Sequence, residues 1–348
     1  MSERIVVSAA IVGGGPSGSV CGYLLRQAGV SCVIIDHVDF PRDKICGGGL
    51  SPKAWRLLES LMPGVSYDYN GVHHLRLLID DRLACEFDSE AELRIVRRRD
   101  FDHVLLREYL GAGGEFRKDA VSDIDELADG TIRLRLASGA EVGCRYLIGA
   151  DGSNSRVRAW LTGRREHGIL AMEQYLDKGV YDQTGDVVVG LSRRYDASGY
   201  FYKFPNQVFD VIGYGDTSTT PQRFRQVLRD KHIPESRFRG AYIYLSNDYP
   251  RHDHVILIGD AGGFANRLTC EGLYDAFKTA HNAARAVIEG IPFSQTNRQV
   301  FAKMRKEKLF ARIFFSAPGF AALRLMCRFP HLIKWCFDTK MKRESFFR

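Results

Sequence analysis

The sequence lacks the cysteine spacings that mark a metal site or a disulfide framework. Its eight cysteines are scattered along 348 residues with no CxxC pair and no Cys/His cluster, which argues against structural zinc and a disulfide-rich scaffold. No apolar run reaches the roughly 18 residues of a membrane span, and the N-terminus lacks a basic and apolar leader. We therefore expect a globular, cytoplasmic protein whose cysteines are mostly reduced, small buried side chains.

Excess positive charge is absent from most of the chain. The net charge is +7, yet residues 301–348 contain twelve Lys or Arg against three Asp or Glu, so the remainder is slightly acidic. This distribution argues against a nucleic-acid-binding protein and indicates a local anionic partner, such as a membrane surface that the tail contacts peripherally. A helical tail that packs on the protein with a solvated basic face is the alternative. The segment is also rich in aromatic residues, as amphipathic membrane-contacting elements are: Phe310, Phe314, Phe315, Phe320, Phe329, Trp335 and Phe337.

A dinucleotide-binding signature stands near the N-terminus. Residues 5–12 form an apolar, β-rich run, the turn GGGPSG follows, a helix is expected over 19–28, and a buried strand over 31–35 ends at an acid. In such a βαβ unit the glycines permit a tight turn, approach of the backbone to a pyrophosphate, and close helix packing, while the acid accepts ribose hydroxyls. The alternative is a glycine-rich turn of an unrelated α/β protein. The predicted binding residues are Gly13, Gly15, Pro16, Ser17, Gly18 and Asp36.

Two later segments repeat the pattern of an apolar strand that ends in an acid. One reads YLIGADGSNSRVR from residue 146, and the other reads VILIGDAGGFANRLTCEG from residue 255. Together with GxGxxG they resemble the FAD-binding motifs of the para-hydroxybenzoate hydroxylase superfamily. The resemblance implies FAD as cofactor, with a helix N-terminus after the last motif directed at the flavin, where it stabilises the reduced form. It assigns cofactor-binding roles to Asp151, Gly152, Gly259, Asp260 and Gly272.

A basic segment at residues 96–102 resembles a further element of that superfamily, RxxFDxxL. Arg98 falls on its arginine, which the resemblance places near the cofactor. A solvated basic turn is the alternative, because three arginines stand in a row.

The segment FPRDKICGGGL at residues 40–50 indicates a branch of the superfamily. It is similar to the PxxKxCGGG signature of the geranylgeranyl reductase family, which reduces double bonds in polyprenyl chains. Consecutive glycines leave backbone N–H groups free to approach a flavin. The resemblance assigns Lys44, Cys46, Gly47 and Gly48 to the cofactor. It implies that Cys46 tunes the flavin or assists proton delivery, and a packing role is the alternative.

A second feature of the family is an aromatic YxWxFP element. Residues 199–205 read GYFYKFP, so Tyr202 replaces the tryptophan, and Tyr200, Tyr202 and Phe204 are expected on one face of a strand. Such a face suits an apolar substrate across a flavin, although ordinary aromatic packing explains it equally.

The sequence departs from the family in the last motif. Arg267 stands where proline is usual and Cys270 where glycine is usual. Arg267 could bind an anionic substrate or stabilise reduced flavin, and Cys270 could face the flavin together with Cys46. The candidate catalytic residues are Cys46, Tyr202 and Cys270.

These observations predict an α/β protein with a Rossmann-type, glutathione-reductase-like FAD-binding domain, an antiparallel β-sheet substrate domain and a helical C-terminal tail. The FAD-binding domain is assigned to 1–70, 97–165 and 251–290, the sheet domain to 71–96 and 166–250, and the tail to 291–348.

Three functions are compatible with this organisation. The first is a geranylgeranyl-reductase-like enzyme that reduces C=C bonds of an apolar or aromatic small molecule, with NADPH or another reductant as electron donor, although the sequence shows no paired acid and base. The second is an FAD-dependent monooxygenase. The third is a non-catalytic FAD-containing protein that binds a membrane or partner. Flavin halogenases are disfavoured because their WxWxIP element and lysine motif are absent.

Overall fold

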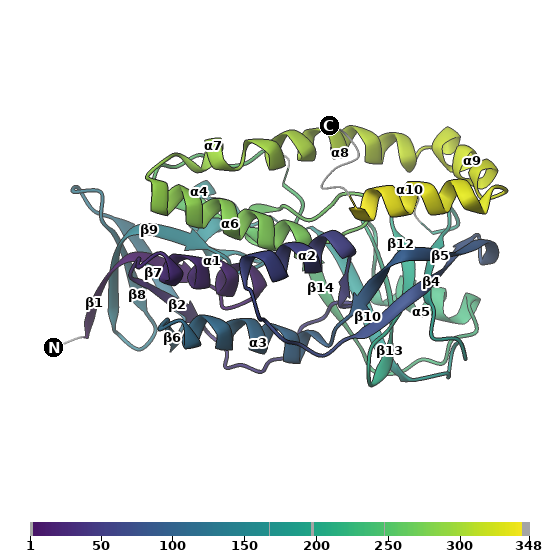
Figure 1. Ribbon diagram of the computed structural model, residues 1–348, viewed down its shortest axis with the longest axis horizontal. Helices are drawn as coiled ribbons and strands as arrows, with labels where there is room; N and C mark the ends of the chain where they lie inside the picture. Colours follow the sequence, from purple (N-terminus) through teal and green to yellow (C-terminus); the bar gives the residue numbers. More distant parts are fainter. Residues whose placement is uncertain (1–2, 167, 196–197, 247, 343–348) are drawn as a thin grey trace.

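Two β-sheets organise the computed structural model, which describes residues 3–342 except 167, 196–197 and 247 (Figure 1). The first sheet has the order β6-β2-β1-β9-β8-β7, with β15 also paired to β9. Its parallel strands are β1 (Arg4–Val12), β2 (Cys32–Asp36), β6 (Glu115–Lys118), β9 (Glu141–Gly149) and β15 (Val255–Leu257), and β7 (Val121–Glu126) and β8 (Ile132–Leu136) add an antiparallel edge.

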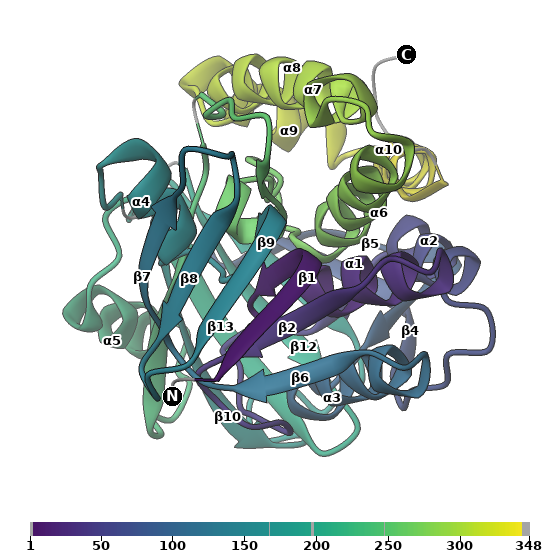
Figure 2. The same cartoon turned by 90° about the vertical axis from the view of Figure 1, so that its left-hand side faces the viewer.

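Helices cover the first sheet because both faces of its central strand are apolar. In β1, Ala9 and Ile11 face one core while Ala10 and Val12 face another, the pattern expected of a parallel sheet buried on both sides. Helices α1 (Pro16–Gln27), α3 (Arg98–Gly111) and α6 (Leu273–Glu289) pack together on one face (Figure 2), and α4 (Arg156–Thr162) lies toward the other.

β8 and the first half of β9 form a hairpin that is continuous with the strand leading into the second motif. β8 pairs with the first half of β9 and β15 with the second half. Residues 141–149 are therefore a single strand that pairs with β1 along its whole length.

The second sheet has eight strands in the order β14-β10-β13-β12-β11-β4-β5-β3. Its pairs are antiparallel except β4 with β11. After β5 the chain passes to the first sheet, where it forms β6 to β9, and it returns to the second sheet at β10. The parallel pair therefore joins β4, formed before this crossing, to β11, formed after it. The strands are β3 (Gly49–Leu50), β4 (Asn70–Ile79), β5 (Arg82–Ile95), β10 (Ile169–Asp177), β11 (Val187–Leu191), β12 (Tyr200–Pro205), β13 (Phe209–Asp216) and β14 (Phe238–Ile243), and α5 (Pro221–Asp230) covers part of one face.

The C-terminal segment folds into helices that pack on both parts of the molecule (Figure 1). Phe320, Leu323 and Cys327 are buried against β4 and β5, and α10 contacts β5 and α2 (Pro52–Leu61). Residues 343–348 lie outside the described residues. The helices are α7 (Phe293–Thr296), α8 (Arg298–Phe314), α9 (Ala317–Met326) and α10 (Pro330–Lys342). The predicted fold class, a Rossmann-type domain with a largely antiparallel sheet and a helical tail, is confirmed.

Candidate functional site

The first glycine-rich turn is shaped by close backbone contacts. Gly13 has a φ of +107°, and a Cβ there would lie 2.4 Å from the carbonyl oxygen of Ala150. A Cβ at Gly18 would lie 1.9 Å from the carbonyl oxygen of Gly13. Both positions therefore require glycine, as the sequence predicts.

The N-terminus of α1 is suited to an anion. Gly15 occupies the N-cap position without a side-chain cap, and Pro16 to Gly18 are buried. A Cβ at Gly15 would meet only the guanidinium of Arg42, at 3.4 Å. Backbone N–H groups at such a helix start have no intrahelical partner and attract a phosphate. The residues present thus fit the pyrophosphate of FAD.

Asp36, at the end of β2, holds the same turn. Its Oδ2 atom accepts a hydrogen bond of 2.8 Å from the N–H of Gly14, and Oδ1 accepts one of 3.2 Å from Val38. The carboxylate is 8% exposed. Its position beside the turn allows it to reach a ribose, and that role stays a prediction.

The three predicted motifs converge, although they lie far apart in sequence. The first contacts the second through Gly13 and Ala150. The second contacts the third because Arg158 donates a 2.9 Å hydrogen bond to the carbonyl of Ala261. The third contacts the first because a Cβ at Gly259 would lie 2.9 Å from Oγ of Ser17. The carboxyl ends of β1, β9 and β15 therefore form one site, the position where open α/β sheets bind ligands.

Asp151 has a structural task within this site. Its carboxylate accepts hydrogen bonds from the Ser155 hydroxyl and from the N–H groups of Arg156 and Val157, so it caps α4. Burial raises its pKa despite these hydrogen bonds. Gly152, with a φ of +74°, has open space at its Cβ position. Cofactor contact by both residues stays a prediction.

The third motif turns sharply before α6. Cys270 adopts a φ of +50°, a conformation that glycine adopts without strain, which explains the usual glycine at this position. Burial and the charge of Asp260 raise the pKa of the Cys270 thiol to about 12, so it is protonated at neutral pH. A Cβ at Gly272 would lie 3.2 Å from Oδ1 of Asp260, and Gly272 leaves the N-terminus of α6 without a side-chain cap.

Arg267 does not project freely from this motif. Its guanidinium donates a hydrogen bond to the carbonyl of Ser246. Burial lowers its pKa, and the opposing charge of Glu307 on α8 stabilises the cation. The structure thus gives Arg267 a part in joining residues 264–271 to α8.

The glycine loop, residues 44–49, packs between α3 and β12. A Cβ at Gly47 would lie 2.2 Å from the ring of Phe204, and one at Gly48 would lie 2.0 Å from the carbonyl oxygen of Val96. Cys46 of this loop lies near the Arg98 guanidinium of α3. The loop can therefore pack this closely only because Gly47 and Gly48 lack side chains.

Arg98 is a buried cation rather than part of a solvated turn. It forms a bidentate ion pair with Asp102, with distances of 2.7 and 2.9 Å. Burial alone would lower its pKa, but Asp102 and Cys46 outweigh this effect and raise it. Arg98 therefore keeps a fixed positive charge beside the glycine loop.

The aromatic row, Tyr200, Tyr202 and Phe204, forms one face of β12 as predicted. Ring centroids are 5.8 Å apart for Tyr200 and Tyr202 and 5.1 Å apart for Tyr202 and Phe204, the latter pair stacked. Burial raises the pKa of Tyr200 well above its usual value, and Cys270 and Cys46 raise it further. Cys270 and Cys46 thus both lie near Tyr200, at the start of the row that contains Tyr202.

One residue of this site was not predicted from the sequence: Glu173 on β10. It is 2% exposed, and its Oε1 atom accepts a hydrogen bond from the Tyr202 hydroxyl. Burial raises the pKa of Glu173 to about 7, although Tyr202, Lys44, the N–H of Cys46 and Arg98 all favour the carboxylate. The sequence does contain a signal for this residue, because the polar pair Glu173 and Gln174 interrupts the apolar strand ILAMEQYL. Both side chains of the pair are buried.

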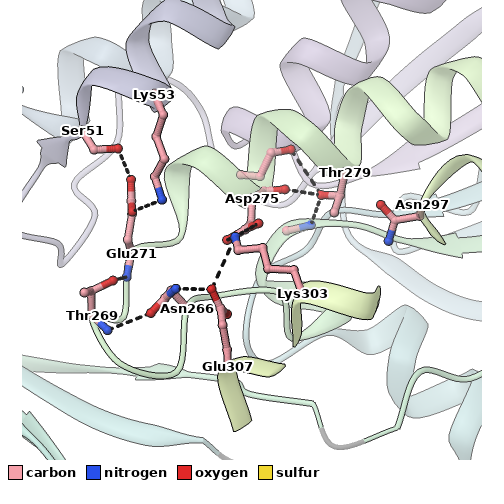
Figure 3. A network of polar contacts seen from close by, with 12 residues as sticks. Ser51, Lys53, Asn266, Thr269, Glu271, Asp275, Thr279, Asn297, Lys303 and Glu307 are labelled. Atoms are coloured by element: carbon pink, nitrogen blue, oxygen red, sulfur yellow. Dashed lines mark hydrogen bonds and ion pairs between the residues drawn. The ribbon is translucent and has the colours of Figure 1, made fainter. Parts of the chain in front are cut away.

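A buried ionic network borders the third motif (Figure 3). Glu271 accepts a hydrogen bond from Ser51 and pairs with Lys53 at 2.9 Å. Lys303 of α8 contacts both carboxylate oxygens of Asp275 at 2.7 and 2.8 Å. Asn266 donates to Glu307, which lies 3.8 Å from Lys303. These contacts attach α8 to α6 and to the loop before it, and attach that loop to the start of α2.

Known proteins resemble this chain in sequence and fold. Residues 6–172 match an FAD binding domain family. The chain is 30% identical over 320 residues to a menaquinone reductase of Mycolicibacterium smegmatis, covering 80% of this chain and 76% of that protein. It is 25% identical over 312 residues to a digeranylgeranylglycerophospholipid reductase of Methanothrix thermoacetophila, covering 82% and 78%. A variant of the halogenase PltM in complex with FAD shares the fold, with a TM-score of 0.73, 16% identity and coverage of 97% and 84%. The matched FAD binding domain family confirms the predicted cofactor, FAD.

Proposed function

Since the chain belongs to the geranylgeranyl reductase family of FAD-dependent oxidoreductases, we propose that it reduces C=C bonds in an apolar, polyprenyl-like substrate. The observation that carries this proposal is the contact between the aromatic row and the glycine loop. Gly47 lies directly on Phe204 and Tyr202, so an apolar surface borders the loop proposed to face the flavin. Geranylgeranyl groups and the side chain of menaquinone are both polyprenyl chains, and the two relatives named above are reductases of compounds that carry them.

Different residues of the chain would bind the cofactor and orient the substrate in such a reaction. The α1 N-terminus and Asp36 would hold the pyrophosphate and ribose of FAD, and the third motif with the α6 N-terminus would hold the flavin end. When bound and reduced, FAD supplies a hydride equivalent. The aromatic row would orient the apolar chain and keep water from it. NADPH or another two-electron reductant is the proposed electron donor.

We expect the protein with FAD and dithionite, or NADPH, to add two hydrogens per reduced double bond to a polyprenyl lipid. Mass spectrometry of the extracted lipid measures this gain, with FAD-free protein as the control. A Tyr202→Ala variant should lose at least about tenfold in rate while it retains FAD, because Tyr202 belongs to the proposed substrate surface.

The principal alternative is an FAD-dependent monooxygenase, because the same FAD motifs serve oxygen-using enzymes. Product that gains oxygen, only in the presence of air and a reductant, would contradict the reductase proposal. Polyprenyl lipid that remains unchanged under anaerobic reducing conditions, across geranylgeranyl and menaquinone substrates, would contradict it as well.

We further propose that the C-terminal helices contact an anionic membrane surface. Leu309 and Ile313 on α8 and Trp335 on α10 are 62%, 56% and 63% exposed, and Arg305 and Arg312 are exposed on α8. Leu309 and Ile313 lie four residues apart and share a helix face. Among the described residues no single helix is long and apolar enough to cross a membrane, whereas α8 and α9 together pass on length and composition but are bent by 83°. Exposed apolar residues among basic ones suit peripheral contact.

The triple variant Leu309→Ser, Ile313→Ser and Trp335→Ser should bind vesicles that contain phosphatidylserine at least about tenfold more weakly, because it loses three apolar side chains that could enter the interface. Flotation on a density gradient measures this binding. A variant with Val6→Ser and Val208→Ser, whose valines are 74% and 59% exposed on other parts of the surface, is the matched control. Equal flotation of both variants and the unmodified protein would remove the membrane proposal.

A further inference from the structure

We propose that the carboxyl group of Glu173 supplies the proton that completes the reduction, with Tyr202 as the residue that positions it. This inference rests on the proposed function, since it identifies the acid of that reaction.

The geometry that joins these residues depends on a glycine. In the second sheet Glu173 of β10 pairs with Gly213 of β13, and Gly213 pairs with Tyr202 of β12. A Cβ at Gly213 would lie 2.1 Å from Cζ of Tyr202. The phenol ring therefore lies over Gly213, and its hydroxyl crosses β13 to donate a hydrogen bond to Oε1 of Glu173.

The other carboxylate oxygen of Glu173 has no hydrogen-bond partner within the part of the chain that the structure describes, although it is buried. A buried polar atom without a partner costs free energy, and this one lies in the part of the sheet that faces the glycine loop. Its electrostatic neighbours there are Lys44, Cys46 and Arg98. Lys44 and Cys46 come from the segment predicted to contact the flavin, so the carboxyl group borders the place where the substrate and the cofactor would meet.

The protonation of Glu173 suits proton transfer near neutral pH. Burial raises its pKa to about 7, so acid and carboxylate forms are both accessible. The titratable and charged groups around it are Lys44 and Cys46 from the glycine loop, Arg98 from α3, Tyr200 and Tyr202 from β12, Tyr175 from its own strand, and Arg239 from β14, which is paired with Glu173 in the sheet. Lys44, Arg98 and the Tyr202 hydroxyl stabilise the carboxylate that remains after the proton leaves.

The reaction balances with one proton from this group. The π bond of the alkene breaks, one carbon forms a C–H bond with the hydride equivalent, and the other forms a C–H bond with the proton. The O–H bond of Glu173 breaks and its electron pair stays on the carboxylate, which water reprotonates. The two electrons come from the two-electron reductant named above, and FAD carries them.

Glu173→Gln keeps the size of the side chain and removes the acid. In single turnovers with photoreduced protein and a polyprenyl lipid, we expect the rate of alkene reduction to fall by about 100-fold or more, with FAD still bound. The matched control is Asp210→Asn. Asp210 is likewise a buried carboxylate of the second sheet with one oxygen lacking a partner among the described residues and a pKa raised by burial, but its charged neighbours are Lys203, Lys178 and Asp182. Asp210→Asn should change the rate by less than about threefold. A Glu173→Gln variant that reduces the alkene at the unmodified rate would overturn the inference.

Two further measurements do not depend on the Gln variant being active. The infrared absorption of a protonated carboxyl should titrate near pH 7 in the unmodified protein and in Asp210→Asn, and this titration should be missing from Glu173→Gln. Tyr202→Phe removes a hydrogen bond that favours the carboxylate, so the pKa of Glu173 should rise, and the loss of rate with increasing pH should move to higher pH. A pH profile that does not move, or a carboxyl signal that persists without Glu173, contradicts the inference. If the unmodified protein shows the titration but reduces no alkene, the proposed function fails and Glu173 is only a buried acid.

Discussion

Gly13→Ala should yield a protein that binds FAD at least about 100-fold more weakly. The added methyl group would lie 2.4 Å from the carbonyl oxygen of Ala150 and 2.8 Å from the nitrogen of Asp151, so the first and second motifs must separate. A φ of +107° adds strain for any residue with a Cβ. Displacement of about 1 Å in a binding site is sufficient for a loss of this size. Flavin absorbance after reconstitution and a fluorescence titration with FAD measure the effect.

Gly29→Ala, at the other end of α1, separates the contact from the backbone strain. Gly29 also has a positive φ, +74°, but a Cβ there would have no atom within 4 Å. This variant should lose roughly 1 kcal/mol of stability and bind FAD as the unmodified protein does. If Gly13→Ala retained the affinity of Gly29→Ala, the proposed convergence of the motifs on FAD would be wrong.

Asp275→Asn should lower the free energy of unfolding by about 3 kcal/mol. The substitution keeps the shape of the side chain but leaves the ammonium group of Lys303 without its bidentate partner. Asp275 is 2% exposed. Burial lowers the pKa of Lys303, and the charge of Asp275 is the strongest of the effects that raise it. A buried charge that loses its partner keeps its desolvation cost. Urea denaturation followed by circular dichroism measures the change.

Glu289→Gln on the same helix is the matched control, since Glu289 pairs with Arg285 at 2.8 Å on the surface. Its stability should hardly change, because solvent screens exposed ion pairs. Adding Lys303→Met to Asp275→Asn should recover much of the loss, since it removes a buried charge whose remaining ion pair, with Glu307, is long at 3.8 Å. A loss for Asp275→Asn as small as that for Glu289→Gln would show that the ionic network contributes little to stability.

The sequence predicts the local parts of this molecule well. Strand, glycine turn and helix are adjacent in the chain around Gly13, so their roles follow from short-range sterics. The same holds for the aromatic row, whose alternation along β12 places three rings on one face. The fold class follows from the succession of such units.

The missed features depend on pairing between distant strands. Nothing near Glu173 in the chain indicates that Tyr202 will cross a glycine to reach it, because this contact requires the register of β10, β13 and β12. The burial of individual lysines in the tail depends on distant packing in the same way. The tail's basic residues suggested a solvated or membrane-facing surface, yet Lys303 and Lys340 are largely buried beside acids of α6 and α8. Charge counts along the chain do not identify which lysines find partners.

Lys340 links the C-terminal helices to the surroundings of the third motif. Burial and the nearby Lys53 lower its pKa to about 8, while Glu271 of the third motif is among its neighbours. Helix α10, which carries Lys340, lies far from α2 in the sequence and packs on it. The first βαβ unit is built from local contacts, whereas the surroundings of Glu271 require α10 to be packed in place. Unfolding of α10 alone would therefore expose Glu271 and its lysine neighbours to water while the βαβ unit stays intact.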